Sequence, residues 1–453
     1  MEQDEKILRN LAVDYLLTTH PFGDEKVSDV PLVDPEKALK QCLRKNKSVN
    51  RKRLADLILG STVMKLRHLY VLFGDSFDGT ALDRQKVRSV VDLHAEYLPD
   101  NDEFSNGIQW PSHPADELSV KYSLPLFLSK LMVDQYGIIE SKLIADKANS
   151  PGPVTLRRNS LKVATDDELI GLLKNIDDVI CDSINSVCGC LKVLPHSGDK
   201  KKKSIWSMQT WKDGLFEVQD MGSQLIVKAA CACPGDVAVD YCTGNGGKAL
   251  SLGSAIMSKD CEKPGHIYAH DVNLMRVKQL LGSLERAGLE ESTITAICDG
   301  TLDDADAGRL EQNSKILNEF PNGLQADLVL VDAPCSSTGV LRRRPSQRWL
   351  IEEEKVLVDL PKLQMEILES ASKYVKKGGR LVYATCSILS SENQDVARKF
   401  ESLNDYHDCW ETWDFDPEWD NVGEYAGQQN WRAILPHKHG CDGFFIARWK
   451  RKN

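Results

Sequence analysis

The chain has 453 residues, of which 42% are hydrophobic and 27% are charged. This length exceeds one typical domain, and the composition is that of a globular protein, which excludes wholly disordered chains and small disulfide-stapled scaffolds. The net charge of −10 excludes a protein that coats nucleic acid through its bulk charge, so any RNA-binding surface must be local.

The thirteen cysteines form no Cys-x-x-Cys pair and no cluster at zinc-ligand spacing, which predicts reduced thiols and no metal site. Two Cys-x-Cys pairs, at 188/190 and 231/233, leave soft-metal binding open as an alternative. The N-terminus shows neither a signal nor a transit pattern, and no apolar run approaches the roughly 18 residues of a membrane span. We therefore expect a cytoplasmic or nuclear, including nucleolar, protein without a membrane partner.

Residues 1–112 are predicted to form a helical domain. Apolar residues recur at three-to-four spacing over 7–17, 35–45, 51–73 and 83–98, and Asp34 before Pro35 matches a helix start. Between Lys37 and Arg67 ten basic residues face a single acid, Asp56. Such a run is either a solvated helix face or an RNA contact.

Residues 113–204 are predicted to form a small α+β subdomain, entered through a polar linker at 101–116. The pattern indicates a helix over 124–137, a strand near 155–161, a helix opened by Thr165 and a strand near 190–194. Four lysines at 200–203 are either a flexible loop or a phosphate contact.

From residue 205 to 453 apolar strands alternate with helices. Strands are predicted at 237–241, 266–270, 294–298, 328–331 and 380–385, with helices at 273–287 and 352–375. This alternation indicates an α/β fold with parallel strands and helical crossovers, in which ligands bind at the carboxyl ends of the strands.

The first of these strands enters a glycine-rich turn, CTGNGGK, at residues 242–248. Glycines let the backbone approach a ligand at the N-terminus of the following helix. The turn is not a P-loop, since Ala249 follows Lys248, and it lacks the dinucleotide pattern G-x-G-x-x-G. It favours a nucleotide-like ligand other than a dinucleotide.

Carboxylates follow three further strands, as Asp271, Asp299 and Asp332. The carboxyl ends of parallel strands share one edge of a sheet, so these groups and the glycine turn can surround one ligand. An acid after the second strand suits the hydroxyls of a ribose. Each aspartate alone could be a helix cap, but the recurrence favours a site.

Two cysteines are expected at the same edge, Cys335 in DAPCSSTG and Cys386 in ATCS. A free cysteine is more often a small core residue than a nucleophile, but these two follow strands at the place where a substrate would bind. Four arginines that follow Cys335 are expected to clamp a polyanionic strand: Arg342, Arg343, Arg344 and Arg348.

These segments resemble a known family. DAPCSSTGVLRRRP, ATCS with the following SENQ, and the turn D-x-C-x-G-x-G-G-K are similar to the RsmB/Sun family of S-adenosylmethionine-dependent RNA cytosine-5 methyltransferases. FEVQDMGSQL, PVTLRRNSLK and DGFFIA extend the resemblance over about residues 113–453. Residues 1–112 resemble the NusB-type RNA-binding domain of the RsmB branch in helix pattern and position.

The resemblance implies a Rossmann-like class I methyltransferase domain at 205–453, S-adenosylmethionine as cofactor, ribosomal RNA as partner, and a monomer active in rRNA processing. It implies that Cys386 is the nucleophile, that Cys335 helps to release the product, and that Asp332 and Lys248 line the place of the target base. Asp271 would hold the ribose of the cofactor and Asp299 would face its adenine. The full set of cofactor-binding residues that it implies is Cys242, Thr243, Gly244, Asn245, Gly246, Gly247, Lys248, Asp271, Asp299 and Asp332.

The chemistry explains these residue types. Carbon 5 of cytosine is a poor nucleophile, so a thiolate must first add to carbon 6 and create an enamine that attacks an electrophilic methyl group. A group near ring nitrogen 3, here Asp332, stabilises the developing charge, and a base then removes the proton at carbon 5. A stacked base hides carbon 6, so single-stranded or splayed RNA is the expected substrate.

The sequence also departs from the family pattern. The cofactor turn lacks the usual proline and contains Asn245, which predicts a looser loop. The arginine segment lacks its usual acid, and SENQ replaces the usual E-E-N-E; both changes are expected to border the RNA path. Three alternatives stay open: transfer RNA as substrate, a DNA methyltransferase with Cys335 as nucleophile, and a non-catalytic ribosome-assembly factor.

Overall fold

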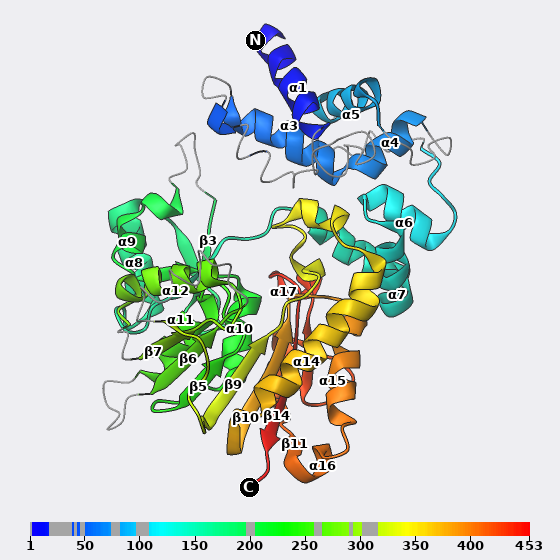
Figure 1. Ribbon diagram of the computed structural model, residues 1–453. Coiled ribbons are helices and arrows are strands. Elements are labelled where there is room, and N and C mark those ends of the chain that lie inside the picture. The colour runs from blue at the N-terminus through cyan, green and yellow to red at the C-terminus, as the bar shows by residue number, and fades with distance from the viewer. Residues whose placement is uncertain are drawn as a thin grey trace. The chain divides into compact units, whose positions relative to one another are not determined.

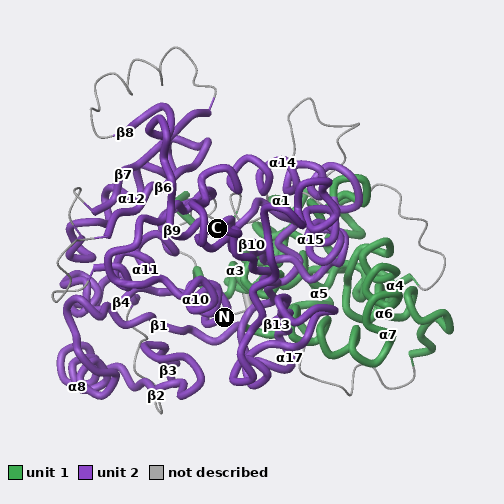
Figure 2. The backbone as a smooth tube through the Cα atoms, turned by 90° about the horizontal axis from the view of Figure 1, so that it is seen from below, with its two compact units in different colours: residues 1–151, 340–355 green, residues 152–339, 356–453 purple. Residues whose placement is uncertain are grey.

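The computed structural model describes residues 2–17, 39, 43–45, 50–73, 82–96, 108–195, 204–257, 265–289, 293–300 and 316–453. The predicted helix start at residues 34–35, most of the helix at 35–45, and the lysines at 200–203 lie outside them. Packing divides the chain into two units (Figure 2), unit 1 with residues 1–151 and 340–355, and unit 2 with residues 152–339 and 356–453. This division differs from the predicted three domains, whose boundaries at 112/113 and 204/205 stay predictions.

Unit 1 is helical in its described part, as expected for the N-terminal region. Its helices are α1 (Glu2–Leu16), α3 (Arg51–Val63), α4 (Lys65–Phe73), α5 (Arg84–Glu96), α6 (Pro114–Tyr122) and α7 (Leu126–Asn149). Leu8, Leu54, Leu57, Val87 and Val90 form a buried core between α1, α3 and α5. The helices therefore pair along the apolar stripes that the sequence predicted.

The single helix predicted at 51–73 is divided in two. Helix α3 ends at Met64, whose N–H donates to Gly60 O, and the N–H of Leu66 at the start of α4 donates to Ser123 Oγ at 2.9 Å. Ser123 itself adopts a left-handed conformation with φ 56°. A side chain distant in the sequence thus satisfies a backbone donor that a continuous helix would have bonded internally.

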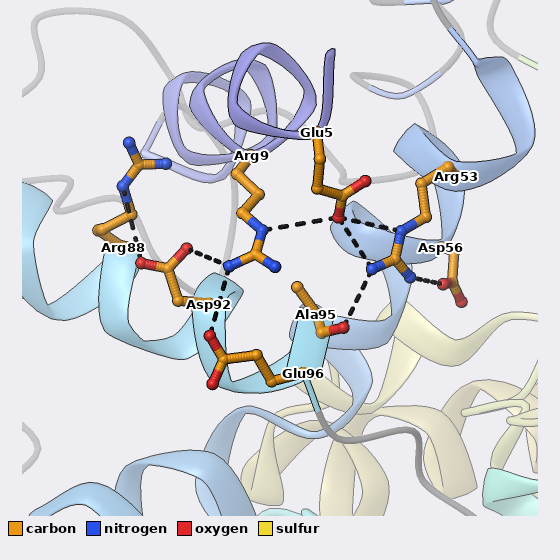
Figure 3. A network of polar contacts seen from close by, with 8 residues as sticks. All are labelled: Glu5, Arg9, Arg53, Asp56, Arg88, Asp92, Ala95 and Glu96. Carbon is orange, nitrogen blue, oxygen red and sulfur yellow. Dashed lines mark hydrogen bonds and ion pairs between the residues drawn. The ribbon is translucent and has the colours of Figure 1, made fainter. Parts of the chain in front are cut away.

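An acid of another helix and an acid of its own helix pair with Arg53, which belongs to the basic run. Arg53 lies 2.9 Å from Glu5 of α1 and 2.9 Å from Asp56, and it donates to Ala95 O at 3.1 Å (Figure 3). In the same network Arg9 pairs with three acids, Glu5, Asp92 and Glu96. Arg53, one of the basic residues of this run, therefore links α3 to α1 and α5.

A segment inserted from the second half of the chain belongs to unit 1. It contains the 3-10 helix Pro345–Trp349, and Trp349 Nε1 donates to Thr62 O at 2.8 Å. Arg348 is fully buried and donates to Ser123 O, Asn149 Oδ1, Ala148 O and Pro345 O. The expectation that Arg348 clamps a polyanionic strand is therefore wrong, because its guanidinium already donates hydrogen bonds to backbone and amide oxygens of the protein.

Unit 2 begins with a small antiparallel sheet in the order β2-β3-β1-β4. Its strands are β1 (Thr155–Arg158), β2 (Cys181–Ser183), β3 (Cys190–Val193) and β4 (Phe216–Val218), and α8 (Asp166–Asp177) covers one face. The Thr165 side chain caps α8 by accepting from Glu168 N, as the sequence indicated. Leu156, Leu169 and Phe216 are buried between helix and sheet.

The larger sheet of unit 2 has the order β12-β13-β14-β10-β9-β5-β6-β7-β8, with β11 beside β14 (Figure 1). The strands are β5 (Val237–Asp240), β6 (His266–His270), β7 (Ile294–Ile297), β8 (Ile316–Leu317), β9 (Ala326–Asp332), β10 (Val375–Thr385), β11 (Trp410–Thr412), β12 (Glu424–Tyr425), β13 (Trp431–Ile434) and β14 (Phe444–Arg451). Strands β10 to β8 run parallel, whereas β14 pairs antiparallel with β10. The order reverses between β5 and β9, so ligands are expected at the carboxyl ends there.

Helices cover this sheet, which confirms the Rossmann-like α/β expectation. Helices α10 (Met221–Ala230), α11 (Gly247–Ile256) and α12 (Leu274–Ala287) pack against β14, β6 and β7 respectively, while α14 (Leu360–Ser372) packs on β9 and β10 and α15 (Gln394–Glu401) packs on α14. The helix predicted at 352–375 is shorter, because a π-helix (Lys355–Asp359) precedes α14 and β10 already begins at Val375. Among the described residues, no helix is long and apolar enough to cross a membrane.

Candidate active site

The glycine-rich turn joins β5 to α11 through two left-handed residues. Gly244 has φ 56° and Gly246 has φ 87°, and Gly246 is the N-cap of α11. A Cβ at Gly246 would lie 2.4 Å from Leu280, whereas a Cβ at Gly244 would meet nothing within 4 Å. Position 246 thus requires glycine for packing, and Gly244 borders open space at the ligand edge of the sheet.

Asp271 organises this turn. Its Oδ2 accepts from the N–H of Gly244 at 2.9 Å, and its Oδ1 accepts from the N–H of Asn273 at 2.8 Å. Each oxygen keeps a further lone pair for a hydroxyl donor. The next residue, Val272, has an apolar side chain that is 65% exposed. The open backbone at Gly244, the carboxylate and this apolar surface fit a nucleoside-containing cofactor such as S-adenosylmethionine.

Asp299 has a partner that the sequence did not indicate. Its Oδ1 lies 2.7 Å from His270 Nε2, and His270 Nδ1 lies 2.7 Å from Tyr241 O. The carboxylate is nevertheless 46% exposed. The rings of Tyr241 and His270 lie beside Phe320, which stacks at 5.7 Å from Tyr241. Histidine thus fixes the Asp299 carboxylate on one side and leaves the other side accessible.

Asp240, which sequence reasoning missed, is buried beneath the turn. Its Oδ2 accepts from Thr243 Oγ1 at 3.0 Å, and within the described residues its Oδ1 has no hydrogen-bond partner. Burial, reinforced by the charges of Asp332 and Asp271, raises the pKa of Asp240 to about 7. The signals in the sequence were its place at the end of the first strand and its position as the first residue of the D-x-C-x-G-x-G-G-K turn.

Lys248 and Asp332 form an ion pair across the strand ends. Lys248 Nζ lies 2.5 Å from Asp332 Oδ2. Burial alone would lower the pKa of Lys248, but the negative charges of Asp332 and Asp240 outweigh burial and raise it. Lys248 is therefore a cation held in a fixed position at the carboxyl ends of β5 and β9. A group that stabilises a developing negative charge has to be held in place in this way.

The two cysteines meet directly. Cys335 follows β9 and Cys386 follows β10, and their Sγ atoms lie 3.2 Å apart. Cys386 Sγ also lies 3.5 Å from Ser337 Oγ. The register of β9 and β10 pairs Ala384 with Asp332, which brings the two cysteine loops to one point of the sheet edge.

The surroundings give the two thiols opposite acidities. The hydrogen bond from Cys335, together with Ser337 and the positive charge of Lys248, lowers the pKa of Cys386. The same hydrogen bond, burial, and the negative charges of Cys386 and Glu392 raise the pKa of Cys335 well above the ordinary value. The mutual hydrogen bond is the largest cause of both shifts, and at Cys386 it acts with Ser337 and Lys248 against burial and the negative charge of Asp332. These directions favour Cys386 as the thiolate of the pair.

The two middle residues of the SENQ segment support the cysteine loop. Glu392 and Asn393 are buried, at 0% and 3% exposure, and Asn393 Nδ2 donates to Ser387 O at 2.9 Å beside Cys386. Their side chains support the cysteine loop from within the protein. The two positions that depart from the family pattern, Ser391 and Gln394, are half-buried, and their place beside an RNA path stays a prediction. Within the described residues, no three His, Cys, Asp or Glu side chains gather as a metal site.

Comparison with known families identifies this arrangement. Residues 231–450 match the family model of the 16S rRNA methyltransferase RsmB/F. Over these residues, just under half of its length, the chain is similar to the RsmB/F methyltransferases. The match contains the glycine turn, the three aspartates at the strand ends and both cysteines, so the site described above lies wholly within the family domain.

Relatives support the same family. The chain is 29% identical over 346 residues to the probable ribosomal RNA small subunit methyltransferase B of Bacillus subtilis, covering 75% of this chain and 69% of that protein. It is 28% identical over 386 residues to the human 28S rRNA (cytosine(4447)-C(5))-methyltransferase, covering 83% of this chain and 44% of the human protein.

Solved structures share the fold. The crystal structure of PH0851 aligns with a TM-score of 0.67 at 22% identity over 98% of both chains. The structure of NSun6 from Pyrococcus horikoshii with SFG aligns with a TM-score of 0.57 at 19% identity, over 73% of this chain and 98% of that one. At these identities the likeness concerns the fold.

Proposed function

We propose that this chain transfers a methyl group from S-adenosylmethionine to carbon 5 of a cytosine in ribosomal RNA, through a covalent adduct with Cys386. The observation that carries the proposal is the 3.2 Å contact between two thiols of opposite acidity, beside the Lys248–Asp332 ion pair. Relatives named as ribosomal RNA methyltransferases, one of them specific for carbon 5 of a cytosine, support the substrate class.

The residues of the cofactor loop have a consistent role in this proposal. A structural neighbour was solved with SFG, an analogue of S-adenosylmethionine. Gly244 gives backbone access, Asp271 accepts from ribose hydroxyls, and Asp299 faces the base of the cofactor. Cys242 and Asn245 complete the turn. The bound cofactor would supply the electrophilic methyl group.

The proposed reaction uses the two cysteines in order. The Cys386 thiolate forms a bond to carbon 6 of the cytosine, and the electron pair of the 5,6 double bond becomes available at carbon 5 for the methyl group. Lys248 and Asp332 lie where the polar edge of the ring and its charge must be stabilised. After a base removes the proton from carbon 5, its electron pair re-forms the 5,6 double bond, the carbon–sulfur bond breaks, and the Cys335 thiol donates a hydrogen bond to the departing Cys386 thiolate.

The test is transfer of a labelled methyl group to total cellular RNA by the native chain, Cys386→Ala and Cys335→Ala. We expect no transfer by Cys386→Ala and an accumulating protein–RNA adduct with Cys335→Ala. Mapping of the 5-methylcytosine distinguishes ribosomal from transfer RNA. RNA binding without any methyl transfer by the native chain would instead support the assembly-factor alternative.

A further inference from the structure

A buried carboxylate that the proposed reaction does not use lies behind the cysteine loops. Glu392 is fully buried and belongs to the 3-10 turn Ser390–Glu392 before α15. Among the described residues, its hydrogen-bond donors are all neutral groups. A buried carboxylate without a cation is costly unless its oxygens are well satisfied, so the contacts that satisfy it define its role.

Glu392 joins the residues that follow the two cysteines. The hydroxyls of Ser336 and Ser387 both donate to Oε2, each at 2.5 Å. The N–H of Ser336 donates to Oε1 at 2.7 Å, and the side-chain amide of Gln364 in α14 donates to Oε1 at 3.1 Å. One side chain therefore ties the loop after β9 and the loop after β10 to the same helix layer.

The two loops have further direct contacts, but the carboxylate is their only charged acceptor in the described part of the chain. Thr338 Oγ1 lies 3.0 Å from Ser387 Oγ, and the N–H of Gly339 donates to Cys386 O at 2.9 Å. Hydrogen bonds to an ionised acceptor are about twice as strong as neutral ones. Loss of the carboxylate should therefore loosen the loops without separating them completely.

We propose that Glu392 is a positioning residue that holds Cys335 and Cys386 at reacting distance through Ser336 and Ser387. The inference rests on the proposed function only in assigning both thiols to one catalytic cycle. It predicts that the rate at which the two sulfur atoms react with each other depends on Glu392, although Glu392 is buried and contacts neither sulfur.

The first experiment measures, in the absence of RNA, how fast the two thiols form a disulfide with each other. The full chain is treated with 4,4′-dithiodipyridine. One cysteine thiolate attacks the disulfide of the reagent and releases one pyridinethiol; the other cysteine then attacks the mixed disulfide, releases a second pyridinethiol and forms the Cys335–Cys386 bond. Two electrons pass from the two thiols to the reagent. Peptide mass spectrometry measures the rate at which this particular disulfide appears.

We expect Glu392→Ala to slow this closure by about tenfold or more, because small losses of orientation cost one to two orders of magnitude. Glu392→Gln should be intermediate, since an amide offers one acceptor oxygen in place of two. The matched control is Glu401→Gln. It alters a carboxylate at the end of α15 that also accepts from neutral donors, Trp449 Nε1 at 2.8 Å and Gln428 Nε2 at 2.8 Å. Its closure rate should stay native.

A second variant keeps the inference falsifiable if Glu392→Ala does not fold. Ser336→Ala combined with Ser387→Ala removes the same two hydroxyl contacts and leaves the carboxylate in place. Native closure rates in both this variant and Glu392→Gln would overturn the inference, as would equal slowing in Glu401→Gln.

Methyl transfer to RNA separates the inference from the proposed function. Glu392→Gln should lower kcat by about tenfold and leave KM for RNA unchanged, because a fully buried side chain does not contact the substrate. A native chain that methylates no RNA, but whose thiol closure depends on Glu392, would overturn the function alone. Methylation by the native chain with unchanged closure and kcat in Glu392→Gln would overturn the inference alone.

Discussion

At the scale of single residues, position decides the chemistry of chemically identical groups. Cys335 and Cys386 are both half-buried thiols, yet their surroundings raise the pKa of Cys335 and lower the pKa of Cys386. Likewise, the pKa of Asp240 is raised to about 7, while Asp332, one strand away, pairs with a lysine. These differences follow from which charges lie nearby, and they make two predictions.

The first prediction concerns Cys386. Because its pKa is lowered, its alkylation by iodoacetamide should rise with pH at a midpoint below the ordinary thiol value of 9.0, and below the midpoint of Cys335. Lys248→Met should move the Cys386 midpoint upward, and Lys248→Arg should restore much of it. Mass spectrometry of the alkylated peptides at several pH values measures both midpoints. Equal midpoints for the two cysteines would refute the assignment.

The second prediction concerns Asp240. Its folded pKa of about 7 lies above the ordinary 3.8, so the folded state binds the extra proton between these values and stability falls as pH rises through that window. Asp240→Asn should therefore melt at a higher temperature than the native chain at pH 8, and the difference should vanish towards pH 4. The exposed Asp134→Asn is the control. A pH-independent difference for Asp240→Asn would contradict this account.

At the scale of elements, a short segment can carry more packing than its length suggests. Residues 340–355 lie between β9 and α14 in the sequence but pack within unit 1 (Figure 2). Arg348 is the buried centre of this packing, and burial lowers its pKa to about 9, with no carboxylate among the described residues to oppose the effect. Carbonyl and amide oxygens stabilise its charge instead.

The third prediction follows from that packing. Arg348→Met should lower the free energy of unfolding by about 3 kcal/mol, because it leaves several buried oxygens without a donor. Exposed Arg344→Ala, four residues earlier, should change it by less than about 0.5 kcal/mol. Urea denaturation followed by helix content measures both. An unchanged denaturation midpoint for Arg348→Met would mean that these hydrogen bonds make no net contribution to the free energy of unfolding.

At the scale of the whole molecule, an acidic chain must bind a polyanion through local surfaces. The net charge is −10, and Glu5 of α1 and Asp56 of α3 itself already pair with Arg53 within the basic run (Figure 3). Binding to RNA should therefore depend on a small number of phosphate contacts rather than on the overall field.

The fourth prediction is a moderate salt dependence. Three contacts to single-stranded RNA correspond to a slope of about −2 in log K against log salt, which is roughly a twentyfold loss from about 50 to about 200 mM salt. Filter binding of a ribosomal RNA fragment over this range gives the slope. A slope near zero would exclude an electrostatic contribution, whereas a slope near about −10 would indicate a far more basic interface.

Runs of consecutive residues are enough to predict the α/β alternation, the glycine turn after the first strand, and the placement of Asp271, Asp299, Asp332, Cys335 and Cys386 at strand ends. These features are local, because the hydrophobic period, the glycines and the end of each strand are all written in neighbouring positions. The connecting helices then require parallel strands, so the amino-acid sequence alone predicts that these residues share one edge of the sheet.

Which side chains meet at that edge depends instead on the folded chain. The 3.2 Å contact of the thiols, the pairing of Asp299 with His270 and the burial of Glu392 all join segments that are distant in the sequence or turned inward by packing. Arg348 follows a run of arginines, so the sequence predicted a phosphate clamp. In the folded chain its guanidinium instead donates hydrogen bonds to oxygens of Ser123 and Asn149, which are distant in the sequence. Burial and long-range partners depend on the whole fold, and local pattern carries no record of them.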